Sequence, residues 1–258
     1  MHVPDGFLST RIWVAFDAVS GASILYAARR LRPEASARSV PMMGVLSAFV
    51  FATQLLNFPV LGGTSGHLVG GALLAVLLGP LAGFLTMATV IVAQALVLQD
   101  GGLAALGANV FNIGAVPVFS GYALFHVVAG RQRRAERLIA GGLVAGWGSL
   151  VVSSACCAVE LALSGAVPLA LALPAMTGYH AVIGLVEGGL TAGVLAFLAR
   201  VRPDLLARES PGRLALADWV AALALVALPC AILALAGTSR LPDPLEKLLQ
   251  SSAGQGRP

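Results

Sequence analysis

Four histidines are the side chains of this 258-residue sequence best suited to binding a transition metal. His2 has a chemical property that a histidine elsewhere would lack, because it directly follows the amine of Met1. That amine, the amide nitrogen of His2 and the His2 Nδ1 atom can bind one metal ion through adjacent five- and six-membered chelate rings. One position in the coordination plane would then stay open for a second imidazole.

His67 is the expected donor of the fourth nitrogen. It ends the segment GGTSGH, whose glycines allow a loop to approach another part of the chain closely. Four nitrogens in a plane suit Ni²⁺ and Cu²⁺, and suit Co²⁺ less well. From the residues alone His67 could instead cap the helix that follows, so both interpretations stay open at this point.

Further polar residues are candidates for orienting the metal ligands or holding the N-terminal segment, although each could instead cap a helix or brace a turn. His180 also precedes Glu187 by seven residues, which predicts an ionisable pair on one helical face, either functional or purely structural. The remaining histidine, His126, is expected to be a packed or interfacial imidazole. The orienting candidates are Asn57, Ser65, Gln94, Asp100, Asn109 and His180.

The composition indicates that these residues belong to a protein embedded in a membrane. Apolar residues make up 58% of the chain and charged residues 11%, and the mean hydropathy is +0.88. A hydrocarbon core about 30 Å thick requires roughly 20 apolar residues per helix, and open strands would leave their backbone groups unpaired there. We therefore expect an all-α, polytopic transmembrane helical bundle. Eight apolar runs predict helices near residues 11–29, 40–57, 67–79, 81–98, 109–129, 138–163, 174–199 and 215–236, with a break at Gly79–Pro80.

The distribution of basic residues predicts the topology. Twelve of the sixteen fall in three loops, those after the first, fifth and seventh predicted helices, and the positive-inside rule places such loops in the cytoplasm. The N-terminus is then extracytoplasmic. Three polar, Gly-rich segments share that outer face: 1–6, 57–67 and 99–109. The basic charge thus reports topology and gives no indication of nucleic-acid binding.

Four segments together resemble the CbiM/NikM family, the metal-binding S components of energy-coupling-factor (ECF) cobalt and nickel transporters. They are MHVPDGFLS, NFPVLGGTSGHLVGG, QALVLQDGGLAALGANVFNIG and TGYHAVIGLVEGGL, in order from Met1 to about residue 200. The resemblance implies seven core helices and metal binding by Met1, His2 and His67. It also implies a bacterial or archaeal cytoplasmic (inner) membrane, Ni²⁺ or Co²⁺ as the transported substrate, and no organic cofactor.

Energy for uptake is expected to come from other chains. The sequence has no GxxxxGK[ST] motif and its single lysine is Lys247, so we expect a transport subunit that is not an enzyme. The family implies a membrane coupling (T) subunit and cytoplasmic ATPase subunits as partners. Gly44, Ala48 and Ala52 form a small-residue face on one predicted helix, and Ala48 and Ala52 are the candidate docking residues, with packing inside the chain as the alternative.

The C-terminal part has a different character. Residues 1–200 are expected to form the metal-binding S component, 201–214 a cytoplasmic linker and 215–250 a transmembrane helix with an extracytoplasmic tail. The tail's TSRLPDPLEKLLQ resembles a degenerate PDGLE motif of the family's small accessory membrane subunit, with Pro244 replacing a glycine. Residues 251–258 are expected to be disordered.

Two other functions fit parts of the sequence. Gly63–Gly66 matches the GxSG of intramembrane serine proteases, with Ser65 as nucleophile and His180 as base. The spacing around His180 is one residue longer than in that family, and four helix steps separate the two residues where that family uses two. A self-powered secondary metal carrier is the second alternative, although acceptor groups for release on the inner face are not evident.

Overall fold

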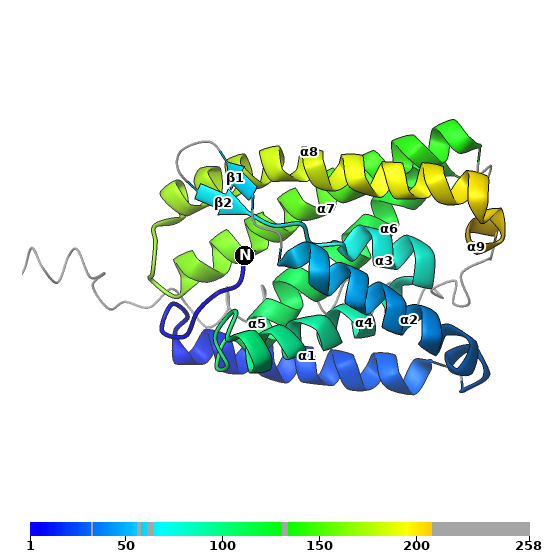
Figure 1. Cartoon of the computed structure of the whole chain (residues 1–258). Helices are drawn as coiled ribbons and strands as arrows, with labels where there is room; N and C mark the ends of the chain where they lie inside the picture. The colour runs from blue at the N-terminus through cyan, green and yellow to red at the C-terminus, as the bar shows by residue number, and fades with distance from the viewer. Residues whose placement is uncertain (32, 56–57, 61–63, 131–133, 208–258) are drawn as a thin grey trace, which may run out of the picture.

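The computed structural model of the chain describes residues 1–207 except 32, 56–57, 61–63 and 131–133 (Figure 1). The described part is a helical bundle, which confirms the predicted class. The helices are α1 (Thr10–Arg30), α2 (Pro33–Gln54), α3 (Gly71–Leu78), α4 (Pro80–Ala93), α5 (Leu106–Asn109), α6 (Val116–Ala129), α7 (Ala135–Leu163), α8 (Leu169–Val201) and α9 (Pro203–Ala207), with π-helical turns η1 (Gln94–Leu98) and η2 (Val110–Ala115).

Four continuous helical stretches are long and apolar enough to cross a bilayer: Pro80–Leu98, Leu106–Ala129, Ala135–Leu163 and Leu169–Val201. The protein is therefore a multi-pass membrane protein. Helix α1 has 21 residues, and the shorter apolar part of α2 runs over Val40–Gln54. The predicted helix at 215–236 and the tail after it lie outside the described residues, as does the linker 201–214 beyond α9.

The predicted break at Gly79–Pro80 is present. Gly79 has φ 82° and ψ 163°, which ends α3 after eight residues, and Pro80 begins α4. Eight helical residues span only about 12 Å, so α3 is too short to cross the bilayer. Its first residue therefore lies at some depth in the bundle, and the loop that precedes it must enter the protein.

The two ends of the bundle differ in charge. Arg29 and Arg30 end α1, Arg134 precedes α7, and Arg200 lies in the last turn of α8. These helix ends gather at the right of Figure 1, whereas the N-terminus and the β1–β2 hairpin lie toward the left. The N-terminus and the hairpin thus lie toward the opposite end of the described part of the molecule from these arginine-bearing helix ends.

A two-stranded antiparallel hairpin is the one non-helical element among the described residues. Strand β1 (Phe58–Val60) pairs with β2 (Thr64–Gly66), with Phe58 opposite Gly66. The hairpin delivers the chain from the end of α2 to His67 and the start of α3. It was not predicted, because the glycines of GGTSGH indicate a loop without specifying backbone pairing.

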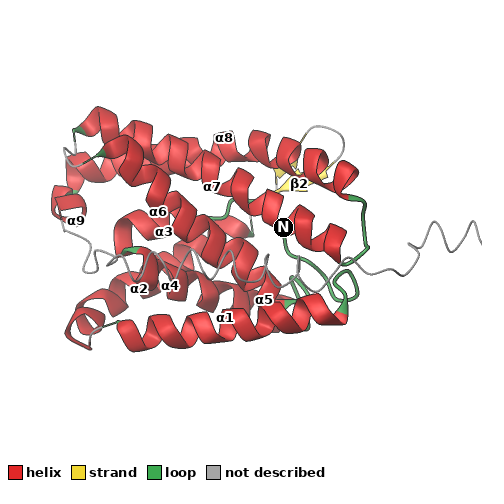
Figure 2. Cartoon of the chain, turned by 180° about the vertical axis from the view of Figure 1, so that it is seen from behind, coloured by secondary structure: helices red, strands yellow, loops and turns green. Residues whose placement is uncertain are grey.

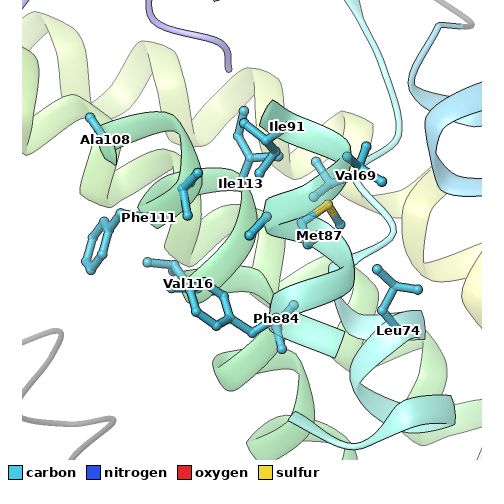
Figure 3. Close-up of a cluster of buried hydrophobic side chains, with 14 of the residues drawn as sticks. Val69, Leu74, Phe84, Met87, Ile91, Ala108, Phe111, Ile113 and Val116 are labelled. Atoms are coloured by element: carbon cyan, nitrogen blue, oxygen red, sulfur yellow. The ribbon is translucent and has the colours of Figure 1, made fainter. Parts of the chain in front are cut away.

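The core fixes the helices that surround the site. Phe84, Met87 and Ile91 of α4 pack with Phe111 and Ile113 in an apolar cluster of buried side chains (Figure 3). On the other side α7 and α8 run side by side, as Figure 2 shows from behind. The two helices approach each other closely at glycines, since a Cβ on Gly146 would lie 2.7 Å from the Gly188 Cα.

Candidate metal centre

The N-terminal segment enters the bundle and is fixed there by Asn109. The Asn109 Oδ1 accepts a hydrogen bond from the Val3 amide at 2.7 Å, and its Nδ2 donates to the Val3 carbonyl at 3.1 Å. The same carbonyl accepts a bond from the Gly102 amide at 2.9 Å. Asn109 is 1% exposed, so these contacts bury the residue that follows His2. Both backbone groups of Val3 are thereby paired.

Asp5 provides a second attachment, to the loop between η1 and α5. Its carboxylate accepts hydrogen bonds from the amides of Leu103, Ala104 and Ala105 at 3.1, 2.9 and 3.2 Å. A Cβ on Gly102 would collide with the Asp5 carboxylate, so glycine is required for this approach. The N-terminal segment and residues 101–105 therefore form one packed unit.

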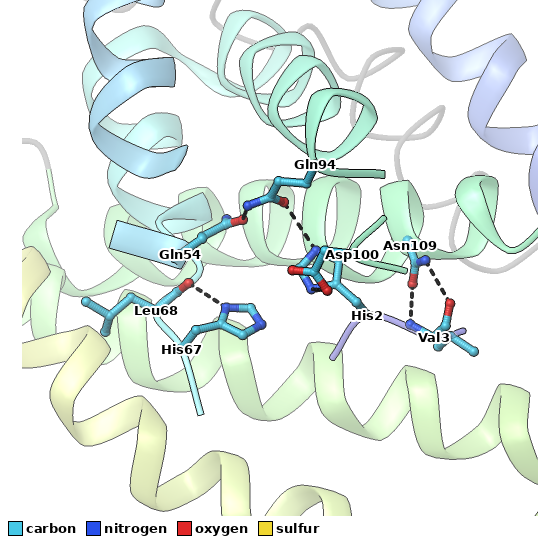
Figure 4. A network of polar contacts seen from close by, with 8 residues as sticks. All are labelled: His2, Val3, Gln54, His67, Leu68, Gln94, Asp100 and Asn109. Atoms are coloured by element: carbon cyan, nitrogen blue, oxygen red, sulfur yellow. Dashed lines mark hydrogen bonds and ion pairs between the residues drawn. The ribbon is translucent and has the colours of Figure 1, made fainter. Parts of the chain in front are cut away.

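The two histidines predicted as ligands lie together. Their ring centroids are 5.2 Å apart, with 32° between the ring planes (Figure 4). The His2 side chain is 6% exposed. Its Nδ1 lies 3.5 Å from an Asp100 oxygen, and Asp100 is half-exposed. Residues 65 positions apart in the sequence thus meet at one buried point.

A relay of amide side chains runs from His2 to the segment that follows His67. The His2 Nε2 lies 3.2 Å from Gln94 Oε1, and Gln94 Nε2 donates to Gln54 Oε1 at 2.8 Å (Figure 4). Gln54 Nε2 in turn donates to the Val69 carbonyl at 2.7 Å. Gln54 Nε2 also lies 3.5 Å from the sulfur of Met87. Both glutamines are buried.

The segment carrying His67 is held from α8. The Glu187 carboxylate accepts hydrogen bonds from the amides of Val69 at 2.9 Å and Gly70 at 2.7 Å. His67 Nδ1 lies 2.9 Å from the Leu68 carbonyl. Glu187 therefore binds backbone amides, and the ionisable pair predicted between Glu187 and His180 is not what holds it.

The nitrogen atoms at this point are poor bases. Burial lowers the pKa of the Met1 amine. Burial, with the positive charge of the terminal amine, lowers the pKa of His2 to about 4 and that of His67 to about 4. Both imidazoles are therefore neutral at pH 7 and have a lone pair available, which metal binding requires.

The structure brings Gln94 and Asp100 to His2, and Asn109 to Val3, the residue after it. His180 Nδ1 instead bonds the Met176 carbonyl of its own helix at 2.7 Å. Asn57 and the side chain of Ser65 lie outside the described residues. Among the described residues no three or more His, Cys, Asp or Glu side chains are grouped to hold a metal, so a metal here would depend on main-chain nitrogen as well.

Sequence reasoning missed Gln54, Asp5 and the clamp made by Glu187. Gln54 lies near the end of a predicted membrane helix, where a polar side chain can indicate a buried hydrogen-bond partner. Asp5 belongs to the turn-like PDG, where its own partners were not evident. Glu187 lies within a predicted membrane helix, but helical spacing points to His180 and cannot reveal a backbone segment 117 residues away.

A multi-pass helical bundle with a buried terminal amine beside two neutral histidines defines a class of membrane protein with a candidate transition-metal site. The family model described as "Cobalt uptake substrate-specific transmembrane region" matches residues 2–205. The chain therefore belongs to the CbiM family.

Curated relatives agree with this assignment. A putative fused nickel transport protein NikMN from Archaeoglobus fulgidus is 41% identical over 95% of this chain and 81% of its own length. The cobalt transport protein CbiM of Sorangium cellulosum is 36% identical over 83% of this chain and 98% of its own.

The fold has also been solved in related proteins. A crystal structure of a transition metal transporter matches with a TM-score of 0.71 and 30% identity, over 78% of this chain and 93% of that chain. A truncated transition metal transporter matches with a TM-score of 0.66 and 28% identity, over 77% and 98%.

Proposed function

We propose that this protein is the substrate-capture membrane subunit of an ECF-type importer for Ni²⁺ or Co²⁺. The observation that carries the proposal is the burial of the Met1 amine together with the His2 and His67 imidazoles, all with lowered pKa values. The names of the relatives support the choice of metals, because they include both nickel and cobalt transport proteins. Those names favour transport over the intramembrane protease.

The proposed ligands are four nitrogens: the Met1 amine, the amide and Nδ1 of His2, and one imidazole nitrogen of His67. The first three form the two fused chelate rings, and the proximity of the two rings supports His67 as the fourth donor. Square-planar nitrogen coordination is well suited to Ni²⁺. Binding releases the proton of the His2 amide, so affinity should rise with pH.

The ion enters from outside in this proposal. The arginine-bearing helix ends lie opposite the end that holds the N-terminal segment, and the positive-inside rule assigns the arginines to the cytoplasm. Asp100 is half-exposed beside the buried His2, and its carboxylate supplies negative charge at the entrance for an incoming cation. The site therefore captures metal from the extracytoplasmic side.

Transport requires the partner chains, a membrane coupling (T) subunit and cytoplasmic ATPase subunits. Gly44, Ala48 and Ala52 of α2 are exposed, and a Cβ on Gly44 would meet nothing within 4 Å. This flat face supports docking on another membrane helix at close range. We expect Ala48→Leu to leave metal binding unchanged but to reduce copurification of the coupling subunit, with Ala22→Leu, at an exposed position on α1, as the matched control.

Calorimetric titration of Ni²⁺ and Co²⁺ into the purified protein tests the site. His2→Ala and His67→Ala should each abolish binding, because each removes an equatorial ligand. His126→Ala is the matched control, since His126 lies on α6 and bonds the Tyr122 carbonyl. Unchanged binding by His2→Ala would overturn the proposal. Metal accumulation in vesicles that contain this chain alone would instead favour a self-powered carrier.

A further inference from the structure

The donor and acceptor roles in the hydrogen bonds that lead to His2 can be assigned one after another, beginning at the Val69 carbonyl. The Val69 carbonyl can only accept, so the Gln54 atom 2.7 Å away must be its NH₂ group. The Gln54 oxygen then faces Gln94, which must present its own NH₂ at 2.8 Å. The Gln94 oxygen is left to face His2 Nε2 at 3.2 Å.

An amide oxygen can only accept, so His2 Nε2 must carry the proton. The His2 Nδ1 atom then has a free lone pair. This is the nitrogen that can close a six-membered chelate ring with the His2 amide, whereas Nε2 lies too far around the ring. A carbonyl two side chains away thus selects the imidazole tautomer that the chelate requires.

The tautomer of the second imidazole, that of His67, is fixed in the same way. His67 Nδ1 lies 2.9 Å from the Leu68 carbonyl, so Nδ1 must carry the proton and Nε2 presents the lone pair. The two carbonyls that fix the two tautomers belong to consecutive residues, Leu68 and Val69. Glu187 holds this segment through the Val69 and Gly70 amides at 2.9 and 2.7 Å.

We infer that Leu68 and Val69, clamped by Glu187, act as a template that sets the tautomers of both histidines through Gln54 and Gln94. Gln54, Gln94 and Glu187 are positioning residues in this inference, because none of them is a proposed ligand. The inference rests on the proposed function for its purpose, but the tautomers can be measured without metal.

Asp100 makes the relay necessary. Its carboxylate lies 3.5 Å from His2 Nδ1 and would accept a hydrogen bond from a protonated Nδ1. A His2 residue without the relay would therefore favour the tautomer that blocks the chelating nitrogen. With Gln94 in place, the Nε2 proton has a buried acceptor and Nδ1 stays open.

The test is ¹⁵N NMR of the metal-free protein labelled at its four histidines, together with Ni²⁺ titration. The wild-type spectrum should show His2 protonated at Nε2 and His67 at Nδ1. Gln54→Met retains the length and apolar stem but breaks the relay. It should shift His2 toward the Nδ1-protonated form and weaken Ni²⁺ binding about 10- to 100-fold, the usual range for residues behind a ligand.

Thr89→Val is the control, because Thr89 is an exposed residue of α4 that bonds the Leu85 carbonyl of its own helix. A wild-type His2 protonated at Nδ1 would overturn the inference even if the variants failed to fold. An unchanged tautomer in a folded Gln54→Met protein would also overturn it. Failure of the proposed function is a separate result. It would appear as unchanged Ni²⁺ binding by His2→Ala, whatever the tautomer of His2 in the wild type.

Discussion

Replacing Asn109 with alanine tests whether docking of the N-terminal segment creates the metal site. The variant loses both hydrogen bonds to Val3 and leaves the buried Val3 amide without its acceptor, whereas the Val3 carbonyl keeps the bond from Gly102. A lost hydrogen bond costs about 0.5–1.5 kcal/mol and an unpaired buried amide about 1–3 kcal/mol. We expect docking to weaken by about 2–4 kcal/mol, or about 30- to 1000-fold.

The assay is the rate at which an amine-selective reagent modifies Met1, followed by mass spectrometry of the N-terminal peptide to separate it from Lys247. The reagent reaches the buried amine only after undocking, so the rate follows the undocked fraction. Ser120→Ala is the control, because Ser120 bonds the Val116 carbonyl of its own helix. Equal rates in the wild type and a folded Asn109→Ala protein would refute this account of docking.

Two further predictions concern the same segment. Gly102→Ala should weaken Ni²⁺ binding at least tenfold, because its Cβ would collide with Asp5, whereas Gly21→Ala has open space and should bind normally; equal affinities would contradict the packing described. Acid should destabilise the metal-free protein, because undocked His2 and His67 take up protons below pH 6.5 and the docked residues only near pH 4. Stability should therefore be complete above pH 6.5 and fall toward pH 4 by up to about 1.4 kcal/mol per pH unit for each histidine. Thermal unfolding between pH 7 and 5 measures this slope, which His67→Gln should reduce; an equal slope would contradict the assigned burial.

The helical class and the break at Gly79–Pro80 could be predicted because both follow from local chemistry. Long apolar runs require helices in a bilayer, and a Gly-Pro pair interrupts them wherever it occurs. The meeting of His2 and His67 could also be anticipated, since the chelate leaves one position open, a Gly-rich loop can bring His67 to it, and the resemblance to the CbiM/NikM family implies both residues as ligands. The ring distance of 5.2 Å agrees with that expectation.

The supports of the site could not be predicted, because they join residues far apart through backbone atoms. Glu187 binds amides of residues 69 and 70, and helical spacing shows only what lies on its own helix. Gln54 presented a polar side chain near a helix end, where a cap was as reasonable as a relay. The partners of such residues depend on how the helices pack, which the sequence pattern does not specify.

Adding two residues before Met1 tests the central claim most directly. A Gly-Gly pair placed there separates the terminal amine from the His2 amide by two further amide groups, so the amine, that amide and Nδ1 no longer form adjacent chelate rings, while every original side chain stays the same. A single glycine is unsuitable, because an amine two residues before a histidine forms a square-planar nitrogen chelate of its own. The account predicts that the extended protein keeps its fold and loses Ni²⁺ and Co²⁺ binding in calorimetric titration, along with the visible absorption of the square-planar Ni²⁺ complex. Wild-type affinity and an unchanged absorption spectrum in the extended protein would contradict it.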